Sequence, residues 1–516
     1  MRRRSPKKLT VALLIALLLC GLDPFMTVTA LTSIIQEWRL PYQLAVWIMT
    51  LYFLAFGVSI PVMKHLSERF GRQYIIAVSL AVCGTGALVS SIAPNYLLLF
   101  AGRLLQGVGA GGLFPPVVAV IKNYNGWKKT LLIVGSALAP LIASFGVSAV
   151  HWRSVFFMQV PFAFFACLLL YRRPYQQRQP VAPFDVLGIL LFTGIAVNLM
   201  TGLIYVEPER FWQSFLGPEV FPFVVVASGL IVPLAMVERQ HRAPLVPPRN
   251  FLTQRTVYPL LTRTFAGMCW ATLMFVPTFA EVLLRHQTGS GGYLAALLAV
   301  TAIVAIFLSR DLIERYGEQV VTAAGFLLIA CGYLLLATVA LRQWSFVLVV
   351  ALLGLGLGLT LIAPIGDAFT LASREDKAKP RVLQENLFQM VGMAVGPSLV
   401  VTFLTQRVAE LPARVSESLM VAPTGAGELA GGTFAELVQG IAELPIVDEV
   451  ALRELIPDDI AVTTQELILR QTMNVMRNGL VEGYQDLFLA ATVFALCGFT
   501  FLLAMWRLEQ DERLKQ

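Results

Sequence analysis

Long apolar runs, separated by short polar segments, extend along almost the whole chain. A helix that crosses a membrane needs about 20 mostly apolar residues, and fourteen of these runs are long enough. The pattern therefore predicts an all-α polytopic membrane protein with fourteen transmembrane helices. The predicted spans are 9–31, 43–63, 74–93, 97–121, 130–150, 154–171, 186–206, 220–237, 258–284, 291–309, 319–340, 345–371, 382–405 and 485–506.

The composition excludes an ordinary soluble protein. Hydrophobic residues make up 57% of the 516 residues and charged residues only 14%, whereas about a quarter of a soluble domain is charged. The net charge of +7 does not indicate nucleic-acid binding, because the basic residues flank the apolar spans. The six cysteines form no Cys-x-x-Cys pair, so neither a metal site nor a cofactor is expected.

The distribution of basic residues predicts the orientation of the chain in the membrane. When the N-terminus is placed in the cytoplasm, most of the 39 Lys and Arg residues fall in cytoplasmic segments, as the positive-inside rule requires. An even number of spans then puts both termini in the cytoplasm. The expected location is the inner or plasma membrane of the cell, and the expected partners are the lipid bilayer, a small-molecule substrate and protons.

An internal repeat relates the two ends of the chain. Three pairs of short segments match in the same order, and the first two pairs are offset by 246 and 247 residues. The pairs are KHLSERFGR (64–72) with RDLIERYGE (310–318), GVGAGG (107–112) with GLGLGL (354–359), and GSALAP (135–140) with GMAVGP (392–397). Two repeats in the same orientation are typical of a transporter that rocks around a site near the membrane midplane.

The repeat divides the chain into three parts. We expect a first six-helix bundle in 1–172 and a second, formed by predicted helices 9–14, in 257–516. The segment 173–256 is then a linker that carries two inserted helices, 7 and 8. A long outer loop at 406–484 contains twelve Asp and Glu against five Arg and no Lys. Short amphipathic helices at the outer surface are expected there, either as a solvated cap or as a docking surface for a periplasmic adaptor protein.

The repeated segments also indicate residues for conformational change. The loop motif after helix 2 and its repeat predict a charged turn that locks and releases the inner ends of the helices, although a merely basic inner loop is the alternative. Glycine and proline in predicted helices 5 and 13 suit helices that bend, with simple close packing as the alternative. The expected gating residues are Glu68, Arg69, Gly71, Arg72, Glu314, Arg315 and Gly317, and the expected bending residues are Gly135, Pro140, Gly392, Gly396 and Pro397.

Two ionisable residues lie deep in the first bundle. At 1.5 Å per residue, Asp23 lies about 21 Å along predicted helix 1, which leaves about 9 Å to the outer edge of a hydrocarbon core of about 30 Å. Arg103, in predicted helix 4, lies about 9 Å below the same edge. A single buried charge is costly, so we predict that the two side chains pair, with Gln106 one turn deeper. Such a carboxylate can exchange a proton as its surroundings alternate; a static ion pair is the alternative.

Other candidates lie in the second half or between the halves. Arg263, near the inner end of its span, is expected to extend its guanidinium to the membrane surface. Aromatic and methionine side chains are expected to line an apolar substrate cavity, although residues of this kind often only pack or contact lipid. The candidates for this cavity are Phe25, Met26, Trp47, Met49, Trp270, Met274, Phe275 and Glu281.

Several of these segments resemble the major facilitator superfamily, and within it the fourteen-helix drug:proton antiporter family. KHLSERFGR is similar to that family's loop motif G-x-L-x-D-R-x-G-R-K, with Lys64 and Glu68 replacing its first Gly and its Asp. RLLQGVGAGG (103–112) matches the motif of helix 4, and LDPFMTVTAL (22–31) is similar to the Asp segment of helix 1. HWRSVFFMQVPF (151–162) resembles the sequence that enters helix 6, with Gln159 where Asn is usual.

The resemblance implies a transporter rather than an enzyme, namely a proton-coupled exporter of small amphipathic compounds. One motif departs from the family: in the antiporter motif of helix 5, Ala139, Ala143 and Ser144 replace glycines. A proton symporter or facilitator for a metabolite is therefore a second hypothesis, and a non-transporting membrane scaffold or sensor is a third. The four histidines all lie in loops, which argues against a catalytic constellation within the membrane.

Overall fold

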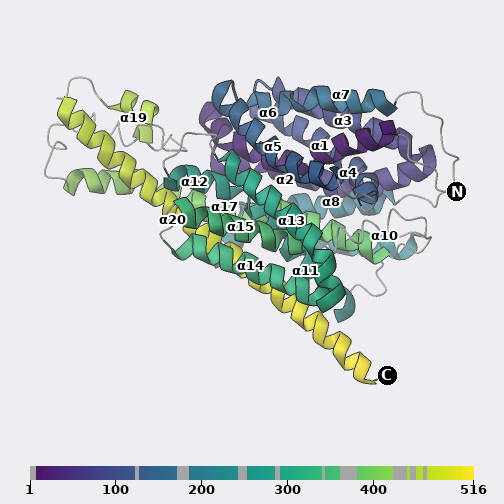
Figure 1. Ribbon diagram of the computed structural model, residues 1–516. Helices are drawn as coiled ribbons and strands as arrows, with labels where there is room; N and C mark the ends of the chain where they lie inside the picture. Colours follow the sequence, from purple (N-terminus) through teal and green to yellow (C-terminus); the bar gives the residue numbers. More distant parts are fainter. Residues whose placement is uncertain are drawn as a thin grey trace.

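The computed structural model (Figure 1) consists of α-helices and short connections in all the residues that it describes. Both termini point to one end of the molecule, which we call the termini face, and the opposite end is the far face. The described residues are 7–121, 127–170, 185–241, 253–284, 291–339, 343–360, 380–421, 439–441, 449–456 and 462–515.

The helices follow the predicted spans closely. Before the linker lie α1 (Lys7–Trp38), α2 (Tyr42–Phe70), α3 (Arg72–Ser91), α4 (Tyr96–Ile121), α5 (Trp127–Ala149), α6 (Arg153–Phe157) and α7 (Gln159–Leu170). The linker contains α8 (Val186–Leu203), α9 (Phe211–Phe215) and α10 (Phe221–Gln240). The remaining helices are α11 (Gln254–Thr272), α12 (Phe275–Leu284), α13 (Gly292–Tyr316), α14 (Glu318–Thr338), α15 (Gln343–Thr360), α17 (Pro380–Val421), α19 (Glu449–Leu455) and α20 (Val462–Lys515).

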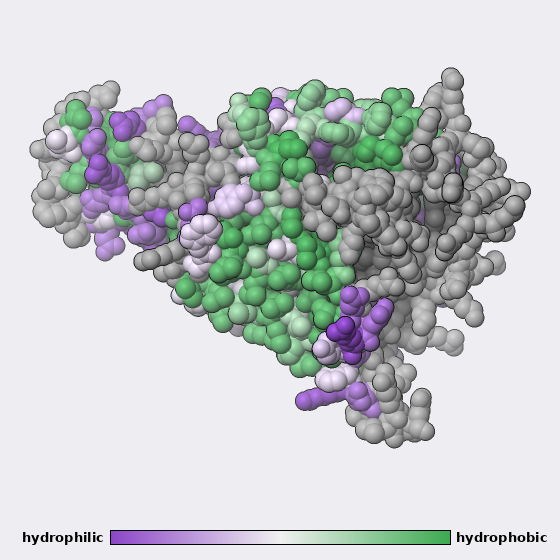
Figure 2. Space-filling view, in the orientation of Figure 1, coloured by the Kyte–Doolittle hydropathy of each residue, from purple (hydrophilic) through white to green (hydrophobic). Residues whose placement is uncertain are grey.

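Twelve helical segments among the described residues are long and apolar enough to cross a membrane. They confirm an all-helical polytopic membrane protein. Helices α1 and α5 coincide with the two other predicted spans, so the count of fourteen stays a prediction, as do the boundaries of the three parts of the chain. In Figure 2 apolar surface covers the middle of the molecule, whereas polar residues gather on the projection at the left and at the lower right. An apolar band of this kind suits contact with lipid chains.

Two predicted spans are interrupted, each shortly before a proline. The span 154–171 is divided between α6 and α7, and α6 ends at Phe157. The span 258–284 is divided between α11 and α12 around Leu273. Pro161 and Pro277 lie four residues after these breaks and have no N–H to donate to the carbonyl there. The missing helical hydrogen bond weakens each span at its break, although other prolines such as Pro140 and Pro397 lie in helices that continue past them.

The expectation of short helices at the outer surface is wrong for much of 406–484. In the described part of that segment, α17 and α20 continue far beyond the apolar band and form a helical arm, the projection at the left of Figure 1. Ion pairs tie the two helices together: Arg407 lies 3.0 Å from Asp486, and Arg414 lies 2.7 Å from Glu482. Because these pairs cross between antiparallel helices, they favour a straight arm over separate surface helices.

Glycines repeat the same helix packing in both halves. A Cβ at Gly107 or Gly111 of α4 would collide with α2, which therefore lies in close contact. At the repeat offset, a Cβ at Gly354 or Gly358 of α15 would collide with α13. Close approach of backbones is the usual reason for such glycines in membrane helices. The sequence repeat is therefore also a repeat of packing geometry.

The two halves meet along two seams. Along one seam α2 packs on α17, where a Cβ at Gly57 would collide with Met390. Along the other seam α5 packs on α13, where a Cβ at Gly292 would collide with Ser144. Both contacts depend on the absence of a side chain on the glycine, so the halves lie in close contact at Gly57 and at Gly292.

The linker helix α8 covers the first seam. Its residues Ile189 and Phe192 form a buried apolar cluster with Leu387 of α17. About two helical turns further along α8, Met200 packs in a second cluster with Leu54 of α2. Because α8 contacts both halves, α2 and α17 have to slide along α8 when they move relative to each other.

The turns between α2 and α3 and between α13 and α14 share an unusual backbone conformation. Gly71 has φ 97° and ψ 138°, and Gly317 has φ 85° and ψ 155°. This region is essentially restricted to glycine, and other residues are strained there by about 1–3 kcal/mol. The two glycines let one helix end and the next begin without an intervening loop.

We predict that Gly317→Ala destabilises the protein by about 1–3 kcal/mol. No atom lies within 4 Å of the position of a Cβ at Gly317, so the cost comes from backbone strain and not from a collision. The control is Gly229→Ala in α10, where a Cβ also meets nothing within 4 Å and the helical backbone accepts alanine. Thermal unfolding in detergent should show a loss of stability for Gly317→Ala alone; equal unfolding temperatures for both variants would contradict the assignment of strain.

Candidate functional site

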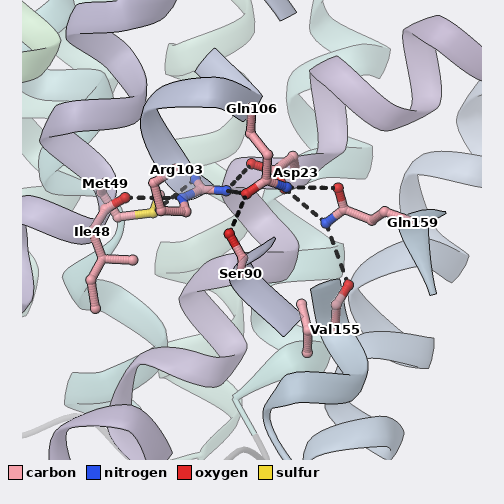
Figure 3. Close-up of polar contacts among 8 residues, drawn as sticks. All are labelled: Asp23, Ile48, Met49, Ser90, Arg103, Gln106, Val155 and Gln159. Carbon is pink, nitrogen blue, oxygen red and sulfur yellow. Dashed lines mark hydrogen bonds and ion pairs between the residues drawn. The ribbon is translucent and has the colours of Figure 1, made fainter. Parts of the chain in front are cut away.

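A buried polar cluster lies inside the N-terminal half (Figure 3), where α1, α4 and α7 meet. Asp23 of α1 is 2% exposed, Arg103 of α4 is fully buried, and Gln106 and Gln159 are also buried. Their surroundings are otherwise apolar, so each polar group needs a partner within the cluster.

Arg103 forms the centre of the cluster. Its Nη1 donates to Asp23 Oδ2 at 2.6 Å and to Gln106 Oε1 at 3.0 Å, while its Nε donates to the carbonyl oxygen of Ile48 at 3.0 Å. The guanidinium also lies over the ring of Tyr52, 4.4 Å from its centroid. These contacts fix the position of the cation, because they restrain its Nη1, its Nε and the face of the planar guanidinium.

The second oxygen of Asp23 is bound by amides. Gln159 Nε2 donates to Asp23 Oδ1 at 2.8 Å, and Gln106 Nε2 approaches the same oxygen at 3.4 Å. The amide of Gln106 also donates to Gln159 Oε1 at 3.2 Å, and Ser90 donates to Gln106 Oε1. Asp23 is therefore paired with one cation and hydrogen-bonded by neutral groups. Removing Arg103 would leave the Asp23 carboxylate buried without its cation, which is strongly destabilising.

The structure brings together the residues that their depth in the membrane predicts to pair. Asp23 and Arg103 are in direct contact, without a bridging group, and Gln106 touches both. Sequence reasoning did not include Gln159 in the site. The signal was its place in the segment that enters helix 6, where it replaces the usual Asn. The roles of these residues in proton coupling stay predictions.

The predicted substrate cavity is only partly as expected. A small apolar cavity between the halves is lined by Phe25, Trp270 and Met274. Trp47 is not among its lining residues, because it packs on the cluster that α8 forms with α2. The carboxylate of Glu281 is turned toward the start of α13, where it accepts a hydrogen bond from the Gly291 N–H at 3.0 Å.

Met26 is also absent from the lining of the cavity. It is 5% exposed and belongs to the main apolar core. Its neighbour Phe25 and Val28, which lies one turn beyond Phe25, do line the cavity, so the helix directs Met26 to another side. Met49 lines the cavity as expected, whereas Phe275 is not among its lining residues. The cavity also contains residues that the predicted set lacks: Pro24, Val28, Phe53, Ala271, Leu273, Pro277, Ala295, Leu298 and Leu357.

The structure describes only some of the predicted gating residues. The side chains of Glu68 and Arg72 lie outside the described residues. The guanidinium of Arg69 lies 5.4 Å from the ring centroid of Phe70, and Glu314 and Arg315 are exposed at the corresponding turn. The positive φ angles of Gly71 and Gly317 give the two turns the same geometry, but a gating role stays a prediction.

The glycines expected to bend helices lie at close helix contacts. A Cβ at Gly135 would approach Leu18 of α1 at 2.7 Å, and one at Gly396 would approach the Cα of Met268 at 2.6 Å. A Cβ at Gly392 would collide with the carbonyl oxygen of Thr264. Close packing, the alternative reading, therefore accounts for these positions. Pro140 and Pro397 lie within α5 and α17, which continue on both sides of them.

A second ion pair lies in the C-terminal half. Arg263 of α11 does not extend to the surface, as the sequence led us to expect. Its Nε lies 3.4 Å from Glu385 Oε2 of α17, and its Nη2 lies 3.8 Å from Glu318. Arg263 and Glu385 are both buried. The pair joins two helices of the same half, so its contacts support packing within that half.

A third cluster closes the far end of the N-terminal half. Glu37, at the end of α1, accepts hydrogen bonds from the indole of Trp152 and from Arg153, which lies 2.8 Å away. His151 Nε2 lies 3.1 Å from the same carboxylate. Partial burial raises the pKa of Glu37, but the hydrogen bonds and the positive charge of Arg153 outweigh it and hold the pKa below its ordinary value. The carboxylate thus fastens α1 to the segment before α6.

No group of His, Cys, Asp and Glu within the described ranges could hold a metal ion. What remains is a membrane-embedded helical protein with a paired buried charge, glycine-packed repeats and a cavity between two halves. This combination defines a transporter.

The family follows from comparison with known proteins. The model of the Major Facilitator Superfamily matches residues 13–397, and the chain belongs to that superfamily. Among its relatives, the uncharacterized MFS-type transporter YfiU of Bacillus subtilis is 24% identical and covers 93% of both chains. A triacylglyceride transporter of Mycolicibacterium hassiacum is 27% identical over 82% of this chain and 83% of its own. The multidrug transporter protein MdtP of Bacillus subtilis is 22% identical over 96% of this chain and 92% of its own.

Solved structures show the same fold. A bacterial homologue of the human lysosomal transporter Spinster, in an inward-facing and unoccupied conformation, aligns with a TM-score of 0.54, 15% identity and coverage of 97% of this chain and 99% of that chain. A proton-dependent oligopeptide transporter aligns with a TM-score of 0.56, 13% identity and coverage of 98% and 100%. At these identities the likeness concerns the fold alone.

We predict that Glu37→Gln lowers the unfolding temperature at pH 7 and weakens the acid sensitivity of the protein. Because the folded-state pKa of Glu37 is depressed, its stabilisation is present above the unfolded-state pKa and is lost as pH falls through the folded-state value. Thermal unfolding between pH 7 and pH 3 should therefore show wild type and variant converging at the acid end.

The control for this experiment is Glu417→Gln, at an exposed position of the arm. It should unfold at the wild-type temperature at pH 7. A constant difference between wild type and Glu37→Gln across the whole pH range would contradict the role given to the Glu37 charge.

Proposed function

We propose that this transporter exports small amphipathic compounds in exchange for protons, and that Asp23 is the carboxylate that carries the proton. The observation that supports this proposal is the fully buried contact of 2.6 Å between Asp23 and Arg103. A structural protein has little use for two charges at this depth, since an apolar pair would pack there at lower cost.

The contacts of Asp23 suggest how a proton changes the cluster. When Asp23 is ionised, it neutralises Arg103 and binds the amides of Gln159 and Gln106. A proton on Asp23 removes the negative charge, and Arg103 then keeps only neutral partners such as the carbonyl oxygen of Ile48. The amides can rotate to present an oxygen to the new O–H. The two protonation states therefore favour different arrangements of α1, α4 and α7.

Coupling follows if the two arrangements favour different orientations of the halves. In an exporter, proton binding from outside and substrate binding from the cytoplasm each allow the molecule to change orientation. One proton moving down 100 mV supplies about 2.3 kcal/mol, which corresponds to a substrate gradient of about fiftyfold. The names of the multidrug relatives are consistent with export.

The orientation of the molecule is part of the proposal. We place the termini face in the cytoplasm, on the support of the positive-inside distribution of Lys and Arg. The helical arm of α17 and α20 then stands outside the cell membrane, where a periplasmic adaptor protein would dock.

The direction of coupling distinguishes the main alternatives. Ala139, Ala143 and Ser144 favour the second hypothesis, a symporter or facilitator, because they replace glycines of the antiporter motif. A symporter would accumulate substrate with the proton gradient, a facilitator would ignore the gradient, and a scaffold would move no substrate in either direction.

We predict that Asp23→Asn abolishes transport driven by a pH gradient while the protein still inserts into the membrane. Asn keeps the shape of the side chain but cannot carry a proton. Counterflow exchange, which needs no net proton movement, should persist. The measurement uses proteoliposomes with an imposed pH gradient and a panel of neutral and cationic fluorescent amphiphiles, with efflux and uptake recorded separately.

Asp486→Asn is the matched control, because this carboxylate also pairs with an arginine but lies at the base of the arm. It should transport at the wild-type rate. Arg103→Ala should lose both coupling and stability, because it leaves Asp23 buried without its cation. Transport driven by the pH gradient at the wild-type rate in Asp23→Asn would refute the proposal. Restoration of folding and of coupled transport in the double variant Asp23→Asn with Arg103→Gln would show that the pair is only structural.

A further inference from the structure

The cavity between the halves is almost entirely apolar. Its described lining contains no Asp, Glu, Lys, Arg or His. The N-terminal half contributes residues of α1 and α2, and the C-terminal half contributes residues of α11, α12, α13 and α15 and of the break between α11 and α12. A bound molecule would therefore touch both moving parts. A site in contact with both halves can respond to their relative motion.

Among the described residues that line the cavity, Trp270 is the one whose side chain carries a strong hydrogen-bond donor. Its ring packs edge to face against Phe25, with centroids 5.9 Å apart, and against Phe53, with centroids 5.3 Å apart. All three rings line the cavity. The indole Nε1 is buried and has no hydrogen-bond partner among the described residues. A buried donor without an acceptor costs about 1–3 kcal/mol, and an acceptor brought by a ligand would remove that cost.

The acidic groups nearest in sequence to this wall are turned away from it. Asp23 precedes the lining residue Pro24, but its carboxylate binds Arg103 and Gln159. Glu281 lies one turn beyond Pro277 and binds the N–H of Gly291. A cation in the cavity would therefore lose its water and gain no counter-charge from the described wall, and the aromatic rings would offset only part of that cost.

We infer that the cavity binds an uncharged amphiphile, whose carbonyl or ether oxygen accepts a hydrogen bond from Trp270 Nε1 while its apolar body contacts both halves. Esters, ketones and ethers have this chemistry, and cationic amphiphiles do not. This inference deepens the proposed function by naming the substrate class, and its meaning for transport rests on that proposal. The binding preference itself requires no proton coupling.

Three small molecules with the same diphenylmethane skeleton separate the contributions of the hydrogen-bond acceptor, the apolar body and a positive charge to binding. Benzophenone carries a carbonyl acceptor, diphenylmethane has no acceptor, and diphenylmethyltrimethylammonium carries a fixed positive charge. Tritiated benzophenone is bound to the purified protein in nanodiscs, with empty nanodiscs subtracted, and is displaced by the other two molecules. Irradiation then attaches benzophenone covalently, and peptide mass spectrometry locates it.

We expect benzophenone to bind about fivefold more tightly than diphenylmethane, the ratio that corresponds to about 1 kcal/mol. The ammonium compound should displace it least effectively, and the label should fall on peptides that line the cavity. In Trp270→Phe the ketone and the hydrocarbon should bind equally, with the affinity for the hydrocarbon unchanged. That unchanged affinity also shows that the variant retains its cavity.

Three outcomes would overturn the inference: a ketone preference that survives Trp270→Phe, preferred binding of the ammonium compound, or no saturable label in the cavity with any probe. A preference of the wild-type protein for the ketone that is lost in Trp270→Phe supports the inference. If that preference is present but Asp23→Asn transports normally, the coupling proposal fails while the binding inference stands. If the preference is absent but coupling depends on Asp23, the binding inference fails while the coupling proposal stands.

Discussion

The Asp23–Arg103 ion pair is the constraint on which the N-terminal half depends. Two opposite charges in an apolar interior are tolerable only while they remain in contact and while their other hydrogen-bonding groups are occupied. The cluster meets both conditions, since amides fill the second oxygen of Asp23 and a backbone carbonyl takes the guanidinium Nε. Helices α1, α4 and α7 are therefore held in one arrangement, and a change in the charge of Asp23 is felt by all three.

Close packing by glycine transmits that arrangement to the rest of the molecule. Gly107 and Gly111 hold α4 against α2, and α2 in turn meets α17 at the seam where a side chain on Gly57 would collide with Met390. The linker helix α8 lies over this seam and contacts both sides of it. The seam between α5 and α13 has no comparable cluster with α8 in the described part of the chain. Motion of the two halves is thus guided differently along the two seams.

Much of this architecture could be predicted from the sequence, because the membrane imposes simple rules. Apolar length located the helices, and a rise of 1.5 Å per residue placed Asp23 and Arg103 at one depth, where the structure shows them in contact. The helical arm could not be predicted in the same way. The acidic, Lys-free composition of 406–484 suggests helices in contact with water. It does not indicate that α17 and α20 each continue without interruption. Ion pairs such as Arg414–Glu482, between residues far apart in sequence, determine that geometry.

The same limit explains the partners that sequence reasoning missed. Gln159 completes the Asp23 cluster, and Arg263 pairs with Glu385, yet each contact joins helices whose relative rotation the apolar pattern does not specify. Rotation also decides that Phe25 lines the cavity and its neighbour Met26 does not. Depth along a membrane helix is thus readable from a sequence, whereas the direction of a side chain requires the packed structure.

The most direct test of the account is whether Asp23 itself takes up a proton from within the apolar bundle. Charge movement after a rapid pH change, recorded on a solid-supported membrane without substrate, reports that event alone. The account predicts a transient in the wild type and in Glu281→Gln, and none in Asp23→Asn at matched protein density. A transient of wild-type size in Asp23→Asn would contradict the assignment of Asp23 as the proton carrier.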